Sequence, residues 1–179
     1  MRRSWLLSSL LATLAAAPAF AQVAGTPFEL SGTAGVMAPD TRAHVLPGPD
    51  YAATLGYRWQ PWLVTEGYGL WAPGKADTTP GGKVNFFSGG LDLRFNLRPG
   101  DGKVVPFLAV GGGYGQSHGI GLDPEKLARG DASIGGGVLF NLFGNSRQYL
   151  RLQVRDVLFR DRGITEFSNN VTAMIGLHL

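Results

Sequence analysis

Apolar and polar residues alternate along most of the chain after residue 21, which is the pattern of strands with one apolar and one polar face. In the segment 84–97, for example, Leu91 and Leu93 share one parity while Asp92 and Arg94 share the other. We expect eight such strands, at residues 27–37, 50–59, 62–72, 84–97, 104–114, 130–142, 147–159 and 168–179. Their lengths of about 10–14 residues suit strands that cross a bilayer at a tilt better than ordinary strands of five or six residues.

The connections between these segments alternate in length. Those after the second, fourth and sixth segments are short, whereas those after the first, third, fifth and seventh are longer and rich in Gly, Pro and charged residues. Short turns at one end and longer loops at the other are typical of bacterial outer-membrane barrels. An even number of strands then places both chain ends on the short-turn side.

Aromatic residues gather near the ends of the expected strands. Near the short turns lie Phe28, Trp59, Trp62, Phe95, Phe107, Phe140 and Tyr149, and near the longer loops lie Tyr51, Trp71, Phe86, Phe87, Tyr114 and Phe159. Two such belts, separated by Gly, Ala, Leu and Val, are the pattern of aromatic girdles at the two membrane interfaces.

Two positions do not follow the alternation. Glu66 shares its parity with Val64 and Leu70, so the facing of the third segment stays open. Asp156 falls on the apolar parity of the seventh segment, where either a bulge or a position at the membrane interface would explain it.

Residues 1–21 differ from the rest of the chain. Arg2 and Arg3 precede an apolar run that ends before Ala19-Phe20-Ala21, a small-x-small pattern. This is typical of a cleaved secretory signal peptide, because the apolar run is shorter than a spanning helix needs. We therefore expect a signal peptide at 1–21 and a single barrel domain at 22–179.

Composition excludes several other classes of protein. The chain has no Cys, which rules out disulfide scaffolds and Cys-ligated metal sites. The formal charge of +3 comes from 16 Lys+Arg against 13 Asp+Glu. Cleavage of the signal would remove Arg2 and Arg3 and leave 14 basic residues against 13 acidic ones. A nucleic-acid partner is therefore not expected.

The signal segment, the eight alternating segments and the final strand VTAMIGLHL resemble the small eight-stranded outer-membrane β-barrels of the outer-membrane protein A and X type. The resemblance covers the whole mature chain and rests on pattern. It implies an all-β, eight-stranded, antiparallel up-and-down transmembrane barrel, integral to the outer membrane of a Gram-negative cell envelope and monomeric. It also implies contact with outer-membrane lipid and lipopolysaccharide, and assembly by the barrel-assembly machinery. Family members commonly end in Phe or Tyr, whereas this chain ends in Leu179.

Closure of the barrel leaves no unpaired strand edge in the bilayer, and eight strands enclose an interior that side chains can fill. Charges buried there must be paired. The candidates for the lumen are Glu29, Arg58, Asp92, Arg94, Asp131, Asn141, Arg151, Gln153 and Arg155, with Glu66 as a further candidate. We predict a network of Glu66, Asp92 and Asp131 with Arg94, Arg151 and Arg155 that plugs the lumen, with the runs 111–113 and 135–137 of Gly allowing close approach to large side chains.

Three alternatives remain open. A lipid A-modifying barrel enzyme could use Ser117 and His118, although adjacent strand residues point to opposite faces. A narrow pore would need an open lumen. A soluble lipocalin-like carrier would need an apolar interior and a terminal helix.

His44, His118 and His178 lie on separate elements, so we predict no metal site. We also expect no catalytic residue and no cofactor.

Overall fold

The computed structural model describes residues 27–40, 44–76, 82–98, 102–119, 128–142, 148–160 and 167–179. The predicted signal peptide lies outside these ranges. The strands are β1 (Phe28–Ala38), β2 (Val45–Leu46), β3 (Gly48–Gln60), β4 (Leu63–Ala76), β5 (Lys83–Asn96), β6 (Val104–Gly119), β7 (Ala128–Asn141), β8 (Tyr149–Arg160) and β9 (Phe167–His178). No helix in the described ranges is long and apolar enough to cross a membrane.

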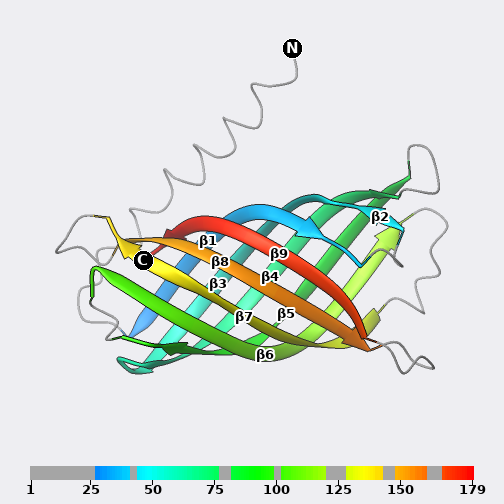
Figure 1. Cartoon of the computed structure of the whole chain (residues 1–179). Coiled ribbons are helices and arrows are strands. Elements are labelled where there is room, and N and C mark those ends of the chain that lie inside the picture. The colour runs from blue at the N-terminus through cyan, green and yellow to red at the C-terminus, as the bar shows by residue number, and fades with distance from the viewer. Residues whose placement is uncertain are drawn as a thin grey trace, which may run out of the picture.

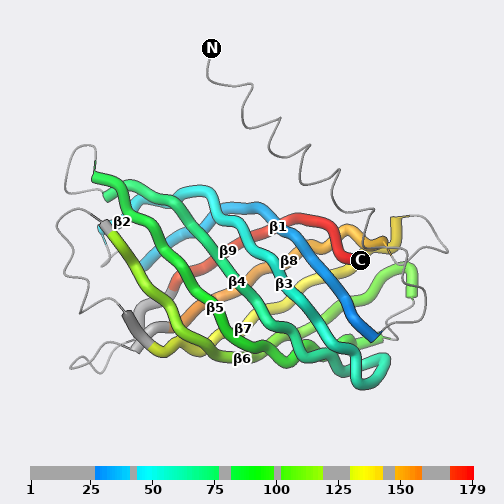
Figure 2. The backbone as a smooth tube through the Cα atoms, turned by 180° about the vertical axis from the view of Figure 1, so that it is seen from behind, coloured from blue at the N-terminus to red at the C-terminus, as the bar shows by residue number. Residues whose placement is uncertain are grey.

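The eight long strands form one closed antiparallel barrel (Figure 1). Consecutive strands pair around the wall, and β1 closes the circle by pairing with β9. β3 pairs with β4 from Leu63 to Trp71. The two-residue strand β2 pairs with the last residues of β4, Lys75 and Ala76, and so extends the wall at the loop end. The strands run obliquely around the barrel, as Figure 2 shows from the opposite side. The predicted fold class is confirmed.

We name the two ends of the barrel by what they carry. The terminal end carries Phe28, Leu179 and the short connections 61–62, 97–103 and 142–148, and the loop end carries the other connections. The expected contrast in loop length is weaker than predicted, because β4 continues to Ala76 and β6 to Gly119, past their expected ends at 72 and 114. Backbone pairing persists through Pro73 and Gly74, where the side-chain alternation fades.

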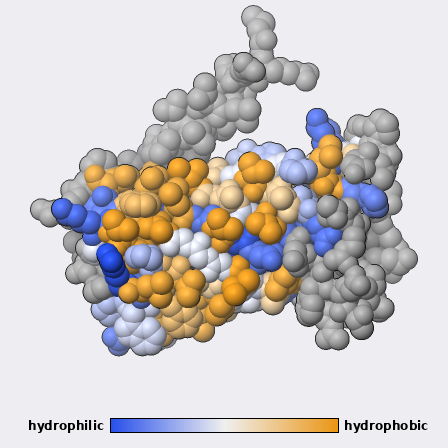
Figure 3. All heavy atoms as spheres, viewed as in Figure 1, coloured by the Kyte–Doolittle hydropathy of each residue, from blue (hydrophilic) through white to orange (hydrophobic). Residues whose placement is uncertain are grey.

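The outer surface of the barrel is apolar. Among its exposed side chains are Leu55, Leu91, Leu108, Ile134, Val154 and Ile175. Much of the wall visible in Figure 3 is accordingly apolar. Such an exterior suits a wall surrounded by hydrocarbon, and all backbone groups of a closed sheet are paired within it.

Exposed aromatic side chains lie toward both ends of the outer surface. They include Phe28, Tyr57, Trp59 and Trp62 toward the terminal end and Tyr51, Trp71, Phe87 and Tyr114 toward the loop end. Neighbouring rings contact each other across strands, as in the stacked pair of Tyr51 and Trp71, whose centroids are 5.6 Å apart. Three residues expected in these belts instead point into the lumen and are buried: Phe86, Phe107 and Tyr149. The side chain of Phe159 lies outside the described part of the structure.

The structure resolves the facing of β4 and of Asp156. Glu66 and its neighbours of the same parity are buried in the lumen, while Gly67 and Trp71 face outward. Asp156 lies on the outer wall between Ile134 and Val171 and is half-buried. The pairing of β8 continues without a shift on both sides of it, which excludes a bulge.

The lumen is filled in layers. Near the terminal end lies an apolar cluster of Val105, Phe107, Leu139 and Tyr149. Toward the loop end lies a second cluster, which we call the apolar layer, of Met37, Leu70, Ala72, Phe86, Val157 and Met174. Charged residues occupy the space between them, so the polar face of the alternating strands is packed inside the barrel.

Candidate functional site

The centre of the lumen holds a carboxylate shared by two arginines. Glu66 projects from β4 and is 1% exposed. Arg151 of β8 binds it with both terminal nitrogens, Nη1 to Oε1 at 2.9 Å and Nη2 to Oε2 at 2.8 Å. Arg94 of β5 donates from Nη1 to the same Oε1 at 2.8 Å. Bidentate charge-assisted pairs of this kind are among the strongest hydrogen bonds in proteins, so three strands are tied together across the barrel.

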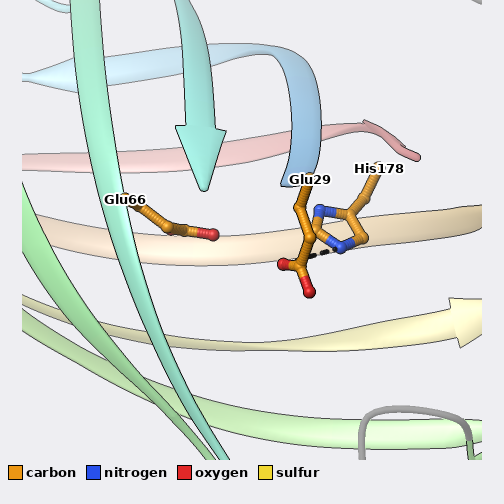
Figure 4. Close-up of side chains that lie close together, drawn as sticks. All are labelled: Glu29, Glu66 and His178. Atoms are coloured by element: carbon orange, nitrogen blue, oxygen red, sulfur yellow. Dashed lines mark ion pairs between the residues drawn. The ribbon is translucent and has the colours of Figure 1, made fainter. Parts of the chain in front are cut away.

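A second carboxylate extends this cluster toward β1 and β9. Glu29 accepts a hydrogen bond from Nη2 of Arg94 and another from Nε of Arg58 at 2.6 Å. Nε2 of His178 lies 3.3 Å from Oε2 of Glu29. Figure 4 shows the side chains of Glu29 and His178 meeting inside the barrel, with the side chain of Glu66 extending toward them from β4. Arg58 is the most exposed member, at 33%, whereas Arg94 is fully buried.

A separate pair lies next to this cluster. Nη2 of Arg155 is 2.7 Å from each carboxylate oxygen of Asp92. The hydroxyl of Ser133 donates to Oδ1 of Asp92 at 2.9 Å. A Cβ at Gly111, which is paired with Asp92 across β5 and β6, would overlap the Asp92 carboxylate. Glycine at this position therefore makes room for the pair.

Asp131 does not pair with the arginines of the predicted network. Its carboxylate accepts hydrogen bonds from the hydroxyls of Tyr68 at 3.1 Å and Ser88 at 2.8 Å. Within the described ranges it forms no ion pair with Arg94, Arg151 or Arg155, because it is paired with Gly113 and Phe159 nearer the loop end. The structure thus brings five of the six predicted residues into ion pairs and attaches the sixth through hydroxyls.

Aromatic rings support the guanidinium groups. Cζ of Arg155 lies 3.6 Å from the centroid of the Tyr68 ring, and those of Arg151 and Arg94 lie 5.0 and 5.6 Å from the Phe107 ring. Arginine over an aromatic face gains from the ring's negative charge density. A Cβ at Gly137 would overlap the backbone oxygen of Leu152 and lie 2.6 Å from the Phe107 ring, so glycine there leaves room for both.

A hydrogen-bonded chain of Ser31, His178 and Glu29 has the order of a nucleophile, a base and an orienting carboxylate. Oγ of Ser31 is 2.6 Å from Nδ1 of His178, whose Nε2 faces Glu29. However, Ser31 is 2% exposed, and its oxygen also accepts a hydrogen bond from Arg151 at 3.1 Å. The hydroxyl of Ser31 is therefore buried within the network and already engaged by both His178 and Arg151.

Glu29, Glu66 and His178 also place one potential ligand atom each within 4.8 Å of one another. The carboxylate oxygens of this trio are already occupied by Arg58, Arg94 and Arg151. A metal ion here would face three guanidinium groups at short range, and the trio is therefore a poor site for a cation.

Ser117 and His118 do not meet. Both lie within β6, which continues to Gly119 without a turn. Ser117 is half-buried, whereas His118 is exposed and contacts Gln116 and the edge of the Phe87 ring. The regular strand directs the two side chains to opposite faces of the wall.

The alternation of the sequence places Glu29 on the lumen face, but it does not assign Glu29 to the central group or connect it with His178. Their positions are 149 residues apart, and only the pairing of β1 with β9 brings them together. The inward facing of His178 can be recognised from the alternation of β9, because His178 shares its face with Asn170 and Thr172, which are both buried in the lumen.

A closed antiparallel barrel with an apolar exterior, aromatic residues toward both ends and a charged interior defines a transmembrane β-barrel protein. The family model for the outer membrane protein beta-barrel domain matches residues 7–175, and the chain belongs to this family. It is an integral protein of the cell outer membrane. No curated protein sequence matches the chain significantly.

Solved structures share the fold at low sequence identity. Neisserial surface protein A aligns with a TM-score of 0.69 and 13% identity, over 86% of this chain and 97% of that one. The N-terminal β-barrel domain of Pseudomonas aeruginosa OprF aligns with a TM-score of 0.54 and 11% identity, over 86% and 98%. The outer membrane enzyme PagL aligns with a TM-score of 0.51 and 13% identity, over 84% and 98%. The same fold thus occurs in an outer-membrane enzyme.

Proposed function

We propose that this outer-membrane barrel is a non-enzymatic structural protein or surface platform whose lumen is closed by the ion pairs of Glu29, Glu66 and Asp92 with arginines. The observation that carries the proposal is the burial of Glu66, Arg94 and Arg151, each at most 1% exposed. These side chains come from β4, β5 and β8 and meet in the interior. Charged side chains that fill the cross-section leave no water-filled path for ions.

A non-enzymatic role is part of the proposal. PagL indicates that the fold can carry catalysis, but two serine–histidine pairs of this chain are unsuited to it. Ser117 and His118 diverge on a regular strand, and Ser31, which contacts His178, is enclosed by the network. A surface role would instead depend on the connections at the loop end.

The same proposal includes orientation and biogenesis. Residues 1–21 act as a cleaved secretion signal, and the mature chain enters the outer membrane through the barrel-assembly machinery. The terminal end, with the short turns, faces the periplasm, and the loop end faces outward into the lipopolysaccharide layer. The barrel is a monomer surrounded by outer-membrane lipid.

Planar-bilayer recording tests the closed lumen. The wild-type barrel should show no steady conductance above that of the bare membrane, whereas Arg94→Ala or Arg151→Ala should each produce measurable conductance, because truncation opens space in the plugged section. Asp156→Ala, on the outer wall, is the control and should leave the membrane as tight as the wild type does. Steady conductance of the wild type, or silence of both arginine variants, would count against a plug.

A further inference from the structure

Two lysines lie directly opposite each other on the outer face of the wall at the loop end. Lys75 of β4 is the cross-strand partner of Lys83 of β5, and both side chains are exposed. Figure 2 shows these two strands side by side along the wall. Opposed side chains in an antiparallel pair have their Cβ atoms only about 5 Å apart, and like charges placed in this way repel each other. Neither lysine forms an ion pair within the part of the chain that the structure describes, so an anion between the two ammonium groups would remove the repulsion.

Further hydrogen-bonding side chains surround the two lysines on the same face of the wall. Asn85 is two residues from Lys83 on β5, and its partner across β6 is His118. His118 is exposed, and its Nε2 lies 3.2 Å from Nε2 of Gln116. Side-chain amides and the imidazole ring each offer N–H donors, and no described residue on this face of β4, β5 and β6 between the aromatic belt and the loop end is acidic. We call Lys75, Lys83, Asn85, Gln116 and His118 the donor patch.

The donor patch lies just beyond the aromatic residues of the loop end. Lys75 is four residues beyond Trp71 on β4, and Lys83 is four residues beyond Phe87 on β5. The rings of Trp71 and Phe87 are stacked with their centroids 6.5 Å apart, and exposed aromatic rings of a barrel lie where hydrocarbon meets headgroups. Four residues span about 13 Å along a strand, or about 9 Å along the membrane normal at a tilt of about 45°. The two ammonium groups therefore lie at the height of lipid headgroups.

Below the two aromatic rings the same face of the wall is apolar. Gly69 and Gly89 form the next cross-strand pair on this face, and a Cβ at Gly69 would have no neighbour within 4 Å. Leu91 follows on β5 and is 63% exposed. Acyl chains of a lipid can therefore lie against β4 and β5 while its headgroup reaches the donor patch.

We propose that the donor patch binds a phosphate group of a phosphorylated glycolipid of the outer leaflet, with Lys75 and Lys83 on either side of the phosphate. Phosphate oxygens accept charge-assisted hydrogen bonds from ammonium groups, and lysine is a common phosphate ligand. A lipid is favoured over a soluble anion because the patch faces away from the lumen and continues into the lipid-facing wall. This inference rests on the proposed orientation, in which the loop end lies in the lipopolysaccharide layer.

Native mass spectrometry of the barrel in a neutral detergent, in buffer free of divalent cations, tests this proposal. The two probes are lipid A with two phosphates and lipid A with the same acyl chains and no phosphate. The wild type should bind the bisphosphorylated form at least about tenfold more tightly than the dephosphorylated form. Lys75→Gln combined with Lys83→Gln should bind the two forms within about twofold of each other. Arg98→Gln combined with Lys103→Gln removes an equal charge from exposed positions at the terminal end and should keep the wild-type preference.

Three results would overturn the proposal. Equal binding of the two forms by the wild type would mean that the barrel does not recognise the phosphate, and this comparison decides the matter even if the lysine variant fails to fold. An undiminished preference in the variant that lacks Lys75 and Lys83 would place the phosphate elsewhere on the barrel. Displacement of bisphosphorylated lipid A by inorganic phosphate or dextran sulfate at equal charge concentration would mean that the patch binds soluble anions and not a lipid.

The orientation on which this inference rests is tested separately in intact cells. A membrane-impermeant amine reagent should label Lys103, which is exposed at the terminal end, only after the cells are lysed. Labelling of Lys103 in intact cells would reverse the orientation and so overturn the assignment to the outer leaflet. Loss of the phosphate preference in detergent would instead overturn the binding site and leave the orientation unaffected.

Discussion

Replacing Glu66 with glutamine should lower the free energy of unfolding by about 3–5 kcal/mol, the range observed when one partner of a buried ion pair is removed. Glutamine keeps the shape of the side chain but not its charge. Among the described side chains, Arg151 would retain only neutral partners, which are Ser31, Thr54, Gln153 and the amide oxygen at position 66, and the one carboxylate left to Arg94 would be Glu29. Denaturant titration of the barrel in lipid vesicles, followed by tryptophan fluorescence, measures the change.

Asp131→Asn is the matched control for this variant. It also changes an acid to its amide, but Asp131 is half-buried and bonded to hydroxyls, so the loss should not exceed about 1.5 kcal/mol. Arg151→Gln in the Glu66→Gln background should restore part of the lost stability, because the uncompensated charge is removed. A double variant as unstable as the sum of the two single variants would show that Glu66 and Arg151 do not interact.

The second large effect is expected at Arg94, which bridges Glu29 and Glu66. Arg94→Met keeps much of the volume and removes the charge, and it should cost about 3 kcal/mol. Arg58→Met provides a sharp comparison, since Arg58 also binds Glu29 but is 33% exposed. Ion pairs open to water contribute at most about 1 kcal/mol, so the Arg58 variant should change stability by no more than that.

The same denaturant titration separates these two arginines. Equal losses for Arg94→Met and Arg58→Met would contradict the view that burial makes the Arg94 pairs important. A stable Arg94→Met barrel would show that methionine packs well enough in the lumen to replace the ion pairs, as well-packed apolar residues can do.

The strands could be predicted because apolar and polar residues alternate wherever one face of a strand lies toward lipid and the other toward the lumen. β5 shows this most clearly, with Leu91 and Leu93 outside and Asp92 and Arg94 inside. β4 could not be assigned in this way. Its outward face includes Gly67 and Gly69, which carry no hydropathy signal, and its inward face mixes Glu66 with Val64 and Leu70. Only the pairing with β3 and β5 determines which side faces the lumen.

The partners within the lumen were harder to predict than the faces. Parity identifies a residue as inward, but which inward residues meet depends on the stagger of the strands around the barrel. Arg151 reaches Glu66 across the interior from β8 to β4, and no local spacing in the sequence encodes that contact. Its charge groups Asp131 with the arginines, yet its height in the barrel places it beside Tyr68 and Ser88.

Position near a strand end does not by itself place an aromatic residue in a belt on the outer surface. Phe86, Phe107 and Tyr149 lie near strand ends, but their parity turns them inward. Phe107 supports Arg94 and Arg151 there, and Phe86 belongs to the apolar layer. An aromatic belt is therefore predicted reliably only when parity and position are considered together.

Whether the chain forms a closed barrel embedded in the outer membrane can be tested in cells. The full chain is expressed in a Gram-negative host, the periplasmic and outer-membrane fractions are separated, and the protein is run on detergent gels with and without boiling. We expect recovery from the outer-membrane fraction and a mobility that changes on heating, because a closed barrel stays folded in detergent until it is heated. Recovery from the soluble periplasm, with the same mobility before and after heating, would contradict a membrane-embedded barrel.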